Sequence, residues 1–253
     1  MRFNNIMENS ELKISICHLY PDLLNIYGDM GNISALVNRL RWRDIDVEVV
    51  EVKSGGRVNY KKHDIYFIGG GQDQQQIMAS IELQKNKDAI FKAAEDNNAV
   101  FLAICGGFQL LGHYYQPHQG NKLSGIGLLD AYTVAGTTRF IGNVTGKVNF
   151  LRQKTIVGFE NHSGLTYLNP GCEPLMKVKI GNGNNGKDKT EGARHKNVFG
   201  TYLHGPVLPK NPEFCDYLLS LALRKRYNCD IPLLKLNDDI ETFAHRDRVG
   251  ARY

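Results

Sequence analysis

The stretch Val100-Phe101-Leu102-Ala103-Ile104-Cys105-Gly106-Gly107-Phe108-Gln109-Leu110-Leu111-Gly112 decides how this chain folds. Its first five residues form a short apolar run that is typical of a buried strand, and the run ends on a cysteine. Two glycines and a helical pattern of apolar residues follow directly. The stretch therefore predicts a strand, a sharp turn with a thiol at its tip and the start of a helix, which is the geometry of a nucleophile elbow.

Such a turn would give Cys105 an environment suited to nucleophilic chemistry. Amide N–H groups at a helix start lower the pKa of a nearby thiol and can stabilise an oxyanion. A strand-end cysteine is also commonly a core residue, because free cysteine is among the most buried residue types. Gly106 and Gly107 favour the catalytic interpretation, since each costs about 1 kcal/mol of helix stability relative to alanine and close approach of a substrate explains that cost.

Length and composition describe an ordinary globular protein. The 253 residues are 42% hydrophobic and 23% charged, with a net charge of +5, which suits one large α/β domain or two small ones. No basic helix with interleaved aromatic residues is present, so nucleic-acid binding is not supported. The longest apolar runs are far too short to span a membrane.

The cysteines indicate a reducing compartment. There are five, at positions 17, 105, 172, 215 and 229, and none forms a C-x-x-C pair. This odd, widely spaced set argues against a disulfide framework and against a zinc or other metal site. The polar segment 1–11 contains no apolar signal region, so we expect a cytoplasmic protein with a short N-terminal extension.

The first half of the chain alternates between predicted strands and helices. Strands are predicted at 12–19, 47–52, 64–68 and 100–104, and helices near 33–43 and over about 75–97. Strands that alternate with helices of this length predict βαβ units and an α/β fold with a mostly parallel sheet.

The second half has a different pattern. Short alternating segments at 129–135, 144–151, 155–160 and 175–180 indicate hairpins or a mixed sheet. Segment 181–196, rich in glycine, asparagine and lysine, is expected to be a long exposed loop. A strand at 198–203 and a helix at 212–227 that opens with proline follow. We expect one domain at 12–227 and a tail at 228–253 that packs loosely or serves as a contact surface.

Three predicted strands end on groups that can act together. They are Gly69-Gly70-Gly71-Gln72, Cys105-Gly106-Gly107 and His204-Gly205-Pro206. In a parallel α/β sheet, ligands gather beyond the carboxyl ends of the strands, so these groups are expected to converge. An ordinary thiol is only a few per cent thiolate at neutral pH, and an imidazole such as His204 makes it effective. Taken alone, His204 is more simply explained as a loop histidine before a proline turn. A catalytic role is favoured because three strands of one predicted sheet end on chemically useful groups.

The same residues resemble a known family. Ala103-Ile104-Cys105-Gly106-Gly107-Phe108-Gln109 is similar to the G-x-C-x-G-x-Q nucleophile motif of class I (triad-type) glutamine amidotransferases. Segments 20–32, 67–72, 158–164 and 200–206 look like the cobyric-acid-synthase-type subgroup, and within it like the glutaminase subunits of lipid II isoglutaminyl synthase. The resemblance covers roughly residues 12–227 and implies a flavodoxin-like, mostly parallel sheet flanked by helices.

The resemblance also implies a mechanism. The Cys105 thiolate would attack the carboxamide of L-glutamine, and His204 would carry the proton to the leaving ammonia. Water would then hydrolyse the thioester to glutamate.

Further residues receive roles through the resemblance. Backbone N–H groups of Gly70, Gly71 and Gly106 would hold the oxyanion. Arg139 would bind the α-carboxylate of glutamine, which suits the bidentate geometry of a guanidinium, and Gln109 would also bind the substrate.

The resemblance implies a partner as well. Ammonia would pass to a Mur-ligase-like MurT subunit in a heterodimer, which amidates the D-glutamate α-carboxyl of the lipid II stem peptide with ATP and Mg²⁺. The chain has no GxxxxGK[ST] motif for binding a nucleotide. We therefore expect no cofactor on this chain and the ATP-dependent step on the partner.

The sequence departs from the class I pattern at the third catalytic position. The usual glutamate two residues after the histidine is Pro206 here, and proline cannot orient an imidazole. The site is then either a Cys–His dyad or uses another carboxylate. Asp29 is the first candidate and Glu160 the second, although Asp29 also suits an Asx-turn or helix cap. Ala103 replaces the first glycine of the motif, a small change that keeps close packing.

Three other functions remain compatible with the sequence. One is a corrinoid-ring amidotransferase, which shares the subgroup motifs but usually follows an ATP-binding domain in a longer chain. Another is a catalytically silent relative that acts as a scaffold. The third is a cysteine hydrolase with a substrate other than glutamine.

Overall fold

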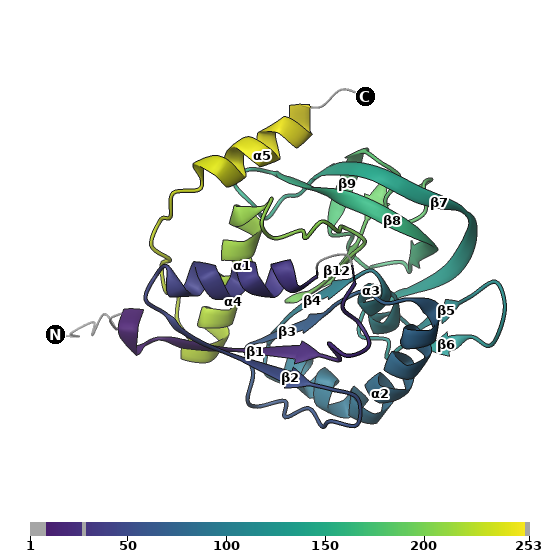
Figure 1. Cartoon of the computed structure of the whole chain (residues 1–253), viewed down its shortest axis with the longest axis horizontal. Coiled ribbons are helices and arrows are strands. Elements are labelled where there is room, and N and C mark those ends of the chain that lie inside the picture. Colours follow the sequence, from purple (N-terminus) through teal and green to yellow (C-terminus); the bar gives the residue numbers. More distant parts are fainter. Residues whose placement is uncertain (1–8, 27–28, 251–253) are drawn as a thin grey trace.

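The computed structural model describes residues 9–26 and 29–250 (Figure 1). Most of the expected extension 1–11, Tyr27 and Gly28 of the segment 20–32, and the last three residues of the tail lie outside the described residues. Of the extension, Asn9–Glu11 forms a short 3₁₀ helix, η1, before the first strand.

A six-stranded sheet forms the centre of the molecule, with the order β11-β12-β4-β3-β1-β2. Its strands are β1 Lys13–Leu19, β2 Asp46–Val52, β3 Ile65–Ile68, β4 Val100–Ile104, β11 Ala193–His195 and β12 Val198–Thr201. All neighbours pair in parallel except β11, which is antiparallel to β12. β3, β4 and β12 are buried along their whole length, as expected for central strands covered on both faces. The predicted α/β fold is confirmed.

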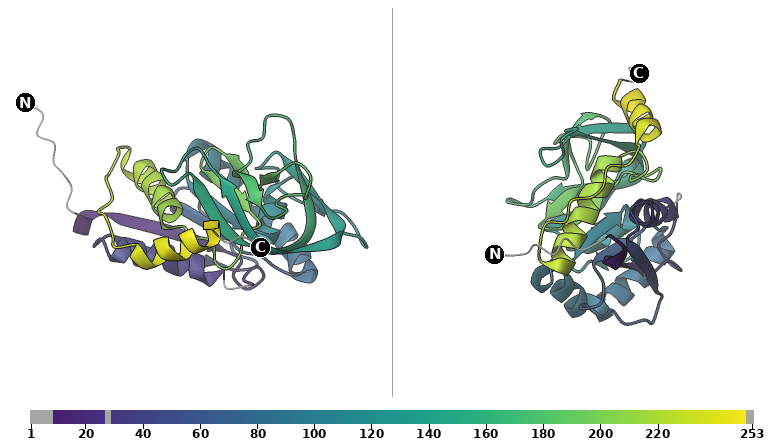
Figure 2. Two further views of the ribbon diagram at one scale, coloured as in Figure 1. Left: turned by 90° about the horizontal axis from the view of Figure 1, so that it is seen from above. Right: turned by 90° about the vertical axis from the view of Figure 1, so that its left-hand side faces the viewer.

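Helices cover the central sheet (Figure 2). They are α1 Met30–Arg41, α2 Asp73–Phe91, a π-helical continuation η2 Lys92–Asp96, α3 Gly106–Leu111 and α4 Pro212–Tyr227. α1 packs against α4, and α2 against α3. The predicted limits of α4 are confirmed: proline at the first turn favours its start, and Asn228 in the left-handed conformation ends it.

A second, mixed sheet lies beside the first and is seen at the right of Figure 1. Its strands are β5 Tyr114–Gln116, β6 Leu123–Ser124, β7 Ala131–Lys147, β8 Thr155–Leu168, β9 Met176–Ile180 and β10 Thr190–Glu191. The mixed sheet expected in this half of the chain is confirmed. The segments 129–135 and 144–151 are not separate strands, however, because parts of both belong to the single strand β7. The β7–β8 register shifts between Ala135 and Phe140, and this irregularity breaks the alternation that sequence reasoning relies on.

The long exposed loop expected at 181–196 is also wrong. The segment contains β10 and β11, and Asn184 and Glu191 are fully buried. Asn184 donates from Nδ2 to the carbonyl of Gly192 at 2.9 Å, and Glu191 accepts from the Tyr202 N–H at 2.7 Å. Side-chain hydrogen bonds order this segment in place of apolar burial, so its polar composition was misleading.

The tail forms a helix, α5 Asp239–Gly250, that packs against β7 and β8. Just before it, Asp238 pairs with Arg39 at 2.6 Å, and buried His245 hydrogen-bonds from Nδ1 to the carbonyl of Lys210 at 2.9 Å. The expectation of loose packing is therefore wrong. The alternative, a contact surface, stays a prediction and suits Ile240 and Phe243, which are 82% and 76% exposed.

Candidate active site

Cys105 occupies the turn between β4 and α3. Its backbone has φ 51° and ψ −106°, a strained combination for a residue with a side chain, and one that nucleophile elbows use. The turn is held from both sides, since the Cys105 N–H donates to the carbonyl of Thr201 at 2.8 Å and the Gly107 N–H to that of Gly69 at 3.1 Å. A Cβ at position 107 would lie 2.6 Å from Ile68 Cγ2, so this position needs glycine.

The glycine loop after β3 lies next to the thiol. A Cβ at Gly70 would be 3.3 Å from the Cβ of Cys105. The Gly70 N–H, however, donates to Asp29 Oδ2 at 2.6 Å. One N–H cannot serve both a carboxylate and an oxyanion, so we keep the amides of Gly71 and Gly106, and not that of Gly70, in the proposed oxyanion hole.

His204 follows β12 and is only 2% exposed. Its backbone pairs with Phe159 of β8, the His204 N–H donating at 2.8 Å. Asp29 approaches it from the start of α1, with 4.0 Å between His204 Nδ1 and Asp29 Oδ1. The Asp29 side chain makes no helix-capping hydrogen bond. Three distant segments thus bring His204, Asp29 and Gly70 together.

Glu160, the second carboxylate candidate, is placed differently. Its oxygens accept hydrogen bonds from the N–H and Nδ2 of Asn182 at 2.9 and 2.7 Å and from the N–H of Gly183 at 2.9 Å. The carboxylate orders this turn of the second sheet, and we leave it out of the proposed site.

Burial dominates the electrostatics of the three central groups. It raises the pKa of Cys105 to about 12, and Asp29 adds to this, whereas the Gly106 N–H and Arg139 lower it. Burial, followed by the charge of Arg139, lowers the pKa of His204 to about 4. Burial also raises the pKa of Asp29 to about 6, against the hydrogen bonds from Gly70 and Ile26. The pKa lowering that we expected from the helix amides is present but is outweighed, so burial favours the neutral form of both the thiol and the imidazole.

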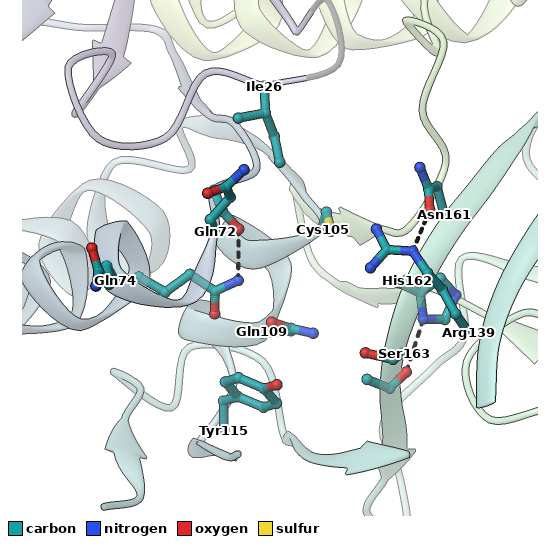
Figure 3. A pocket seen from close by; sticks show the side chains of 13 residues that line it. Ile26, Gln72, Gln74, Cys105, Gln109, Tyr115, Arg139, Asn161, His162 and Ser163 are labelled. Carbon is teal, nitrogen blue, oxygen red and sulfur yellow. Dashed lines mark hydrogen bonds between the residues drawn. The ribbon is translucent and has the colours of Figure 1, made fainter. Parts of the chain in front are cut away.

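A polar cavity of about 410 Å³ opens beside Cys105 (Figure 3). His204 is buried and is not among its lining residues. The lining residues are Ile26, Gly71, Gln72, Gln74, Gln76, Cys105, Gln109, Tyr115, Arg139, Asn161, His162, Ser163 and Gly164. Most of them come from the glycine loop, α2 and the elbow with α3 on one side and from β7 and β8 on the other, and Ile26 and Tyr115 of β5 complete the lining.

Both residues predicted to bind the substrate line this cavity. Arg139 lies where the β7–β8 register shifts, and its Nε donates to Asn161 Oδ1 at 2.7 Å. Figure 3 shows its guanidinium on the cavity wall opposite Gln72. Gln109, one turn after Cys105 in α3, donates from Nε2 to Tyr202 Oη at 3.0 Å.

Sequence reasoning assigned no role to several residues of this wall. His162 is one: its Nδ1 donates to the carbonyl of Gly164 at 2.8 Å and its ring stacks on Tyr202 at 3.6 Å between centroids. Burial is the main cause that lowers the pKa of His162 to about 4. The motif Glu160-Asn161-His162 was visible as a family marker, but only the folded β8 shows that its members face different surroundings.

Fold and site together define an α/β protein with a cysteine nucleophile elbow, the class to which glutamine amidotransferases belong. Residues 15–212 match the CobB/CobQ-like glutamine amidotransferase domain, and the chain belongs to this family, within it to the GatD group. The GatD subunit of the lipid II isoglutaminyl synthase (glutamine-hydrolyzing) of Staphylococcus aureus (strain N315) is 45% identical over 214 residues, which are 85% of this chain and 86% of the relative. The subunit of the same name from Streptococcus pneumoniae (strain ATCC BAA-255 / R6) is 41% identical over 234 residues, 91% and 88% of the two chains.

More distant comparisons agree on the fold. A cobyric acid synthase of Listeria innocua serovar 6a is 30% identical over 213 residues, which are 78% of this chain but 40% of that protein. A crystal structure of a glutamine amidotransferase superposes with a TM-score of 0.56 at 18% identity, covering 81% of this chain and 98% of the other. A second one, from Thermotoga maritima, gives 0.53 at 14% identity, with 93% and 92% covered.

Proposed function

We propose that this chain hydrolyses L-glutamine to glutamate and ammonia at Cys105. The observation that carries the proposal is the strained elbow that presents this thiol to a polar cavity. Gly70, next to the thiol, is hydrogen-bonded to Asp29, which lies 4.0 Å from His204. As Sγ attacks the carboxamide carbon, its proton passes to His204. The amides of Gly71 and Gly106 hold the negative oxygen that forms.

The second half of the reaction returns the enzyme to its starting state. His204 gives its proton to the amide nitrogen, the C–N bond breaks and ammonia leaves a thioester on Cys105. Water then attacks the thioester carbon, loses a proton to His204 and releases glutamate, while the thiol is protonated again.

Asp29 is the positioning residue for His204 in this proposal. Its ionised carboxylate, 4.0 Å from Nδ1, stabilises the imidazolium that forms when the thiol loses its proton. Because the pKa of Asp29 is raised to about 6, this support is present above that pH and is lost below it.

The substrate is held at both ends. Arg139 binds the α-carboxylate through its guanidinium, whose orientation Asn161 fixes. Gln109 lies at the elbow end of the same cavity. This arrangement suits a free amino acid with a side-chain amide.

The relatives suggest where the ammonia goes. Both GatD proteins are named as subunits of lipid II isoglutaminyl synthase. We extend this role to the present chain: a cytoplasmic heterodimer with a Mur-ligase-like MurT subunit that binds ATP and Mg²⁺ and amidates the D-glutamate α-carboxyl of the stem peptide. In residues 9–26 and 29–250 no helix is long and apolar enough to cross a membrane, and no group of three or more His, Cys, Asp or Glu residues could hold a metal.

The test is glutamate release from L-glutamine by the purified chain, alone and with a co-expressed Mur-ligase-like subunit. Release that requires Cys105 and rises with the partner supports both parts of the proposal. Release that the partner leaves unchanged favours the corrinoid alternative, although that relative is a much longer protein. If no glutamate is released in either setting, the chain is better explained as a catalytically silent scaffold or as a cysteine hydrolase with a substrate other than glutamine.

A further inference from the structure

The first turn of α1 packs directly onto the loop 202–211, which follows β12 and carries His204. A Cβ at Gly31 would clash with Cγ of Pro206 and lie 3.1 Å from its Cβ, so glycine at position 31 lets the proline ring come this close. Pro206 stands where the class I pattern has its glutamate. In this protein the position therefore supplies a packing contact to α1 in place of a carboxylate.

Asn32, the next residue of α1, joins the same two segments by a hydrogen bond. Its Oδ1 accepts from the N–H of Leu208 at 3.0 Å, and the residue is fully buried. Its backbone N–H donates to the carbonyl of Asp29 at 2.9 Å. Asn32 thus holds the residue that bears the carboxylate with its backbone and the histidine loop with its side chain.

The carboxylate of Asp29 is directed toward the active site because it does not cap its own helix. Asp29 stands directly before α1, where an aspartate usually accepts from an N–H of the first turn. A capping residue has an extended backbone, whereas Asp29 is helical, with φ −53° and ψ −29°, and makes no capping hydrogen bond. Its Oδ2 instead accepts from the Gly70 N–H at 2.6 Å, and its Oδ1 lies 4.0 Å from His204 Nδ1.

His204 and Asp29 are held by different neighbours. The His204 backbone pairs with Phe159 of β8, with N–H to carbonyl hydrogen bonds of 2.8 and 3.2 Å in the two directions. Asp29 is bonded to the glycine loop after β3. At 4.0 Å the support that Asp29 gives to an imidazolium is electrostatic and weakens as the two groups separate. The separation therefore depends on the contact between the first turn of α1 and the loop 202–211.

We propose that Asn32 is a positioning residue: its hydrogen bond to the loop 202–211 keeps the carboxylate of Asp29 against His204. The inference rests on the proposed glutaminase function and deepens it. In the class I pattern the histidine and the glutamate lie on one loop, two residues apart. Here the carboxylate comes from another segment, so a link between the two segments has to set its place.

The test is a double-mutant cycle between positions 32 and 29, measured as kcat for L-glutamine at pH 8. Asn32→Leu keeps the approximate size of the side chain and removes the oxygen that accepts from Leu208. We expect it to lower kcat roughly three- to tenfold in the wild type and by less than about twofold in the Asp29→Asn background. Equal losses in the two backgrounds would overturn the inference, because Asn32 would then act without Asp29.

Gly31→Ala tests the same contact without removing a hydrogen bond. Alanine is the better helix former, but its Cβ clashes with Pro206 and pushes the turn away from the loop. We again expect kcat to fall in the wild type and to stay constant in the Asp29→Asn background, and equal losses would contradict the inference here too. This variant decides the question if Asn32→Leu does not fold, which the thermal unfolding curve and alkylation of Cys105 by iodoacetamide reveal.

The dependence of kcat on pH gives a second readout. Asp29, whose pKa is raised to about 6, faces two other titratable groups, Cys105 and His204. The fall of kcat below that pH should be smaller in Asn32→Leu than in the wild type, whereas a residue that only stabilises the fold would leave it unchanged. The matched control is Asn38→Leu, at an exposed position of α1, which should retain the wild-type kcat and pH dependence.

Two further outcomes separate this inference from the proposed function. Failure of the wild type to release glutamate contradicts the glutaminase itself. A wild-type kcat in Asp29→Asn would overturn the inference alone, because Asn32 would then have no carboxylate to position.

Discussion

The two walls of the candidate active site are built in different ways. On one side, the central parallel sheet places Cys105 and the glycine loop at the ends of buried strands, where backbone hydrogen bonds fix them. On the other, the long antiparallel pair β7 and β8 carries the exposed Arg139 and the half-buried Asn161 near an irregularity of the ladder. The backbone thus fixes the position of the reacting thiol, whereas the binding residues of the second wall depend on side-chain contacts. The comparison predicts that substitution of Cys105 acts on kcat and that substitution of Arg139 acts on KM.

The largest expected effect comes from the first wall. Cys105→Ala should lower glutamate release by at least about 10³-fold, because no other group in the proposed mechanism can form the thioester. The measurement is initial-rate kinetics with L-glutamine. Cys229→Ala, at an exposed cysteine far along the chain, is the control and should retain wild-type rates. Residual activity within tenfold of wild type in Cys105→Ala would remove the elbow from the mechanism.

On the second wall, Arg139→Met should raise KM for glutamine by roughly 10- to 100-fold with little change in kcat. The reason is the loss of charge-assisted hydrogen bonds to the α-carboxylate, each worth about 1.5–3 kcal/mol. Steady-state kinetics separates the two constants, and Arg224→Met, at a surface arginine, serves as control. If kcat falls instead and KM stays constant, the division between the two walls is wrong.

Asp29→Asn should make the enzyme slower and the fold more stable. The carboxylate has its pKa raised from 3.8 to about 6, so the folded state carries a cost that is absent below about pH 4, grows between pH 4 and 6 and is complete above. Two pKa units correspond to about 3 kcal/mol, an upper bound for the gain. Asparagine can still accept from Gly70.

Urea unfolding at pH 4 and pH 8 tests the stability part of this prediction. The variant should gain at pH 8 and lose that gain at pH 4. In the wild type, kcat should fall as the pH drops through about 6. In Asp29→Asn this pH dependence should be absent, and kcat should be roughly tenfold lower than in the wild type. Equal stability of the two proteins at pH 8 would show that Asp29 is not held in a costly environment.

The smallest expected effect at neutral pH concerns His162, on the second wall. Its pKa is lowered from 6.5 to about 4, so the unfolded chain takes up a proton before the folded one does. The resulting loss of stability begins below about pH 6.5 and reaches up to about 3 kcal/mol near pH 4. His162→Asn should flatten this part of the profile of unfolding free energy against pH. An unchanged slope would mean that folding does not lower the pKa of His162.

Much of the central sheet could be predicted because its signals are local. The apolar runs at β3 and β4 are continuous and short, and the apolar residues of β1 alternate with polar ones. The second sheet was harder, since the irregularity in β7 interrupts its alternation. The prediction for segment 181–196 was wrong for another reason. Its order depends on side-chain hydrogen bonds such as those of Glu191, and a pattern of apolar residues gives no sign of these.

The sequence by itself determined the elbow, the glycine loop after β3 and the histidine after β12, because strand ends in a parallel sheet converge by topology. It also carried the motifs that assign the chain to its family. Only the tertiary structure decided which neighbours these groups have. It placed the Gly70 amide on Asp29 and turned Glu160 toward Asn182. The reason is physical: strand propensity and chain order are local properties, whereas burial, pKa values and side-chain partners arise from segments that meet only when the chain is folded.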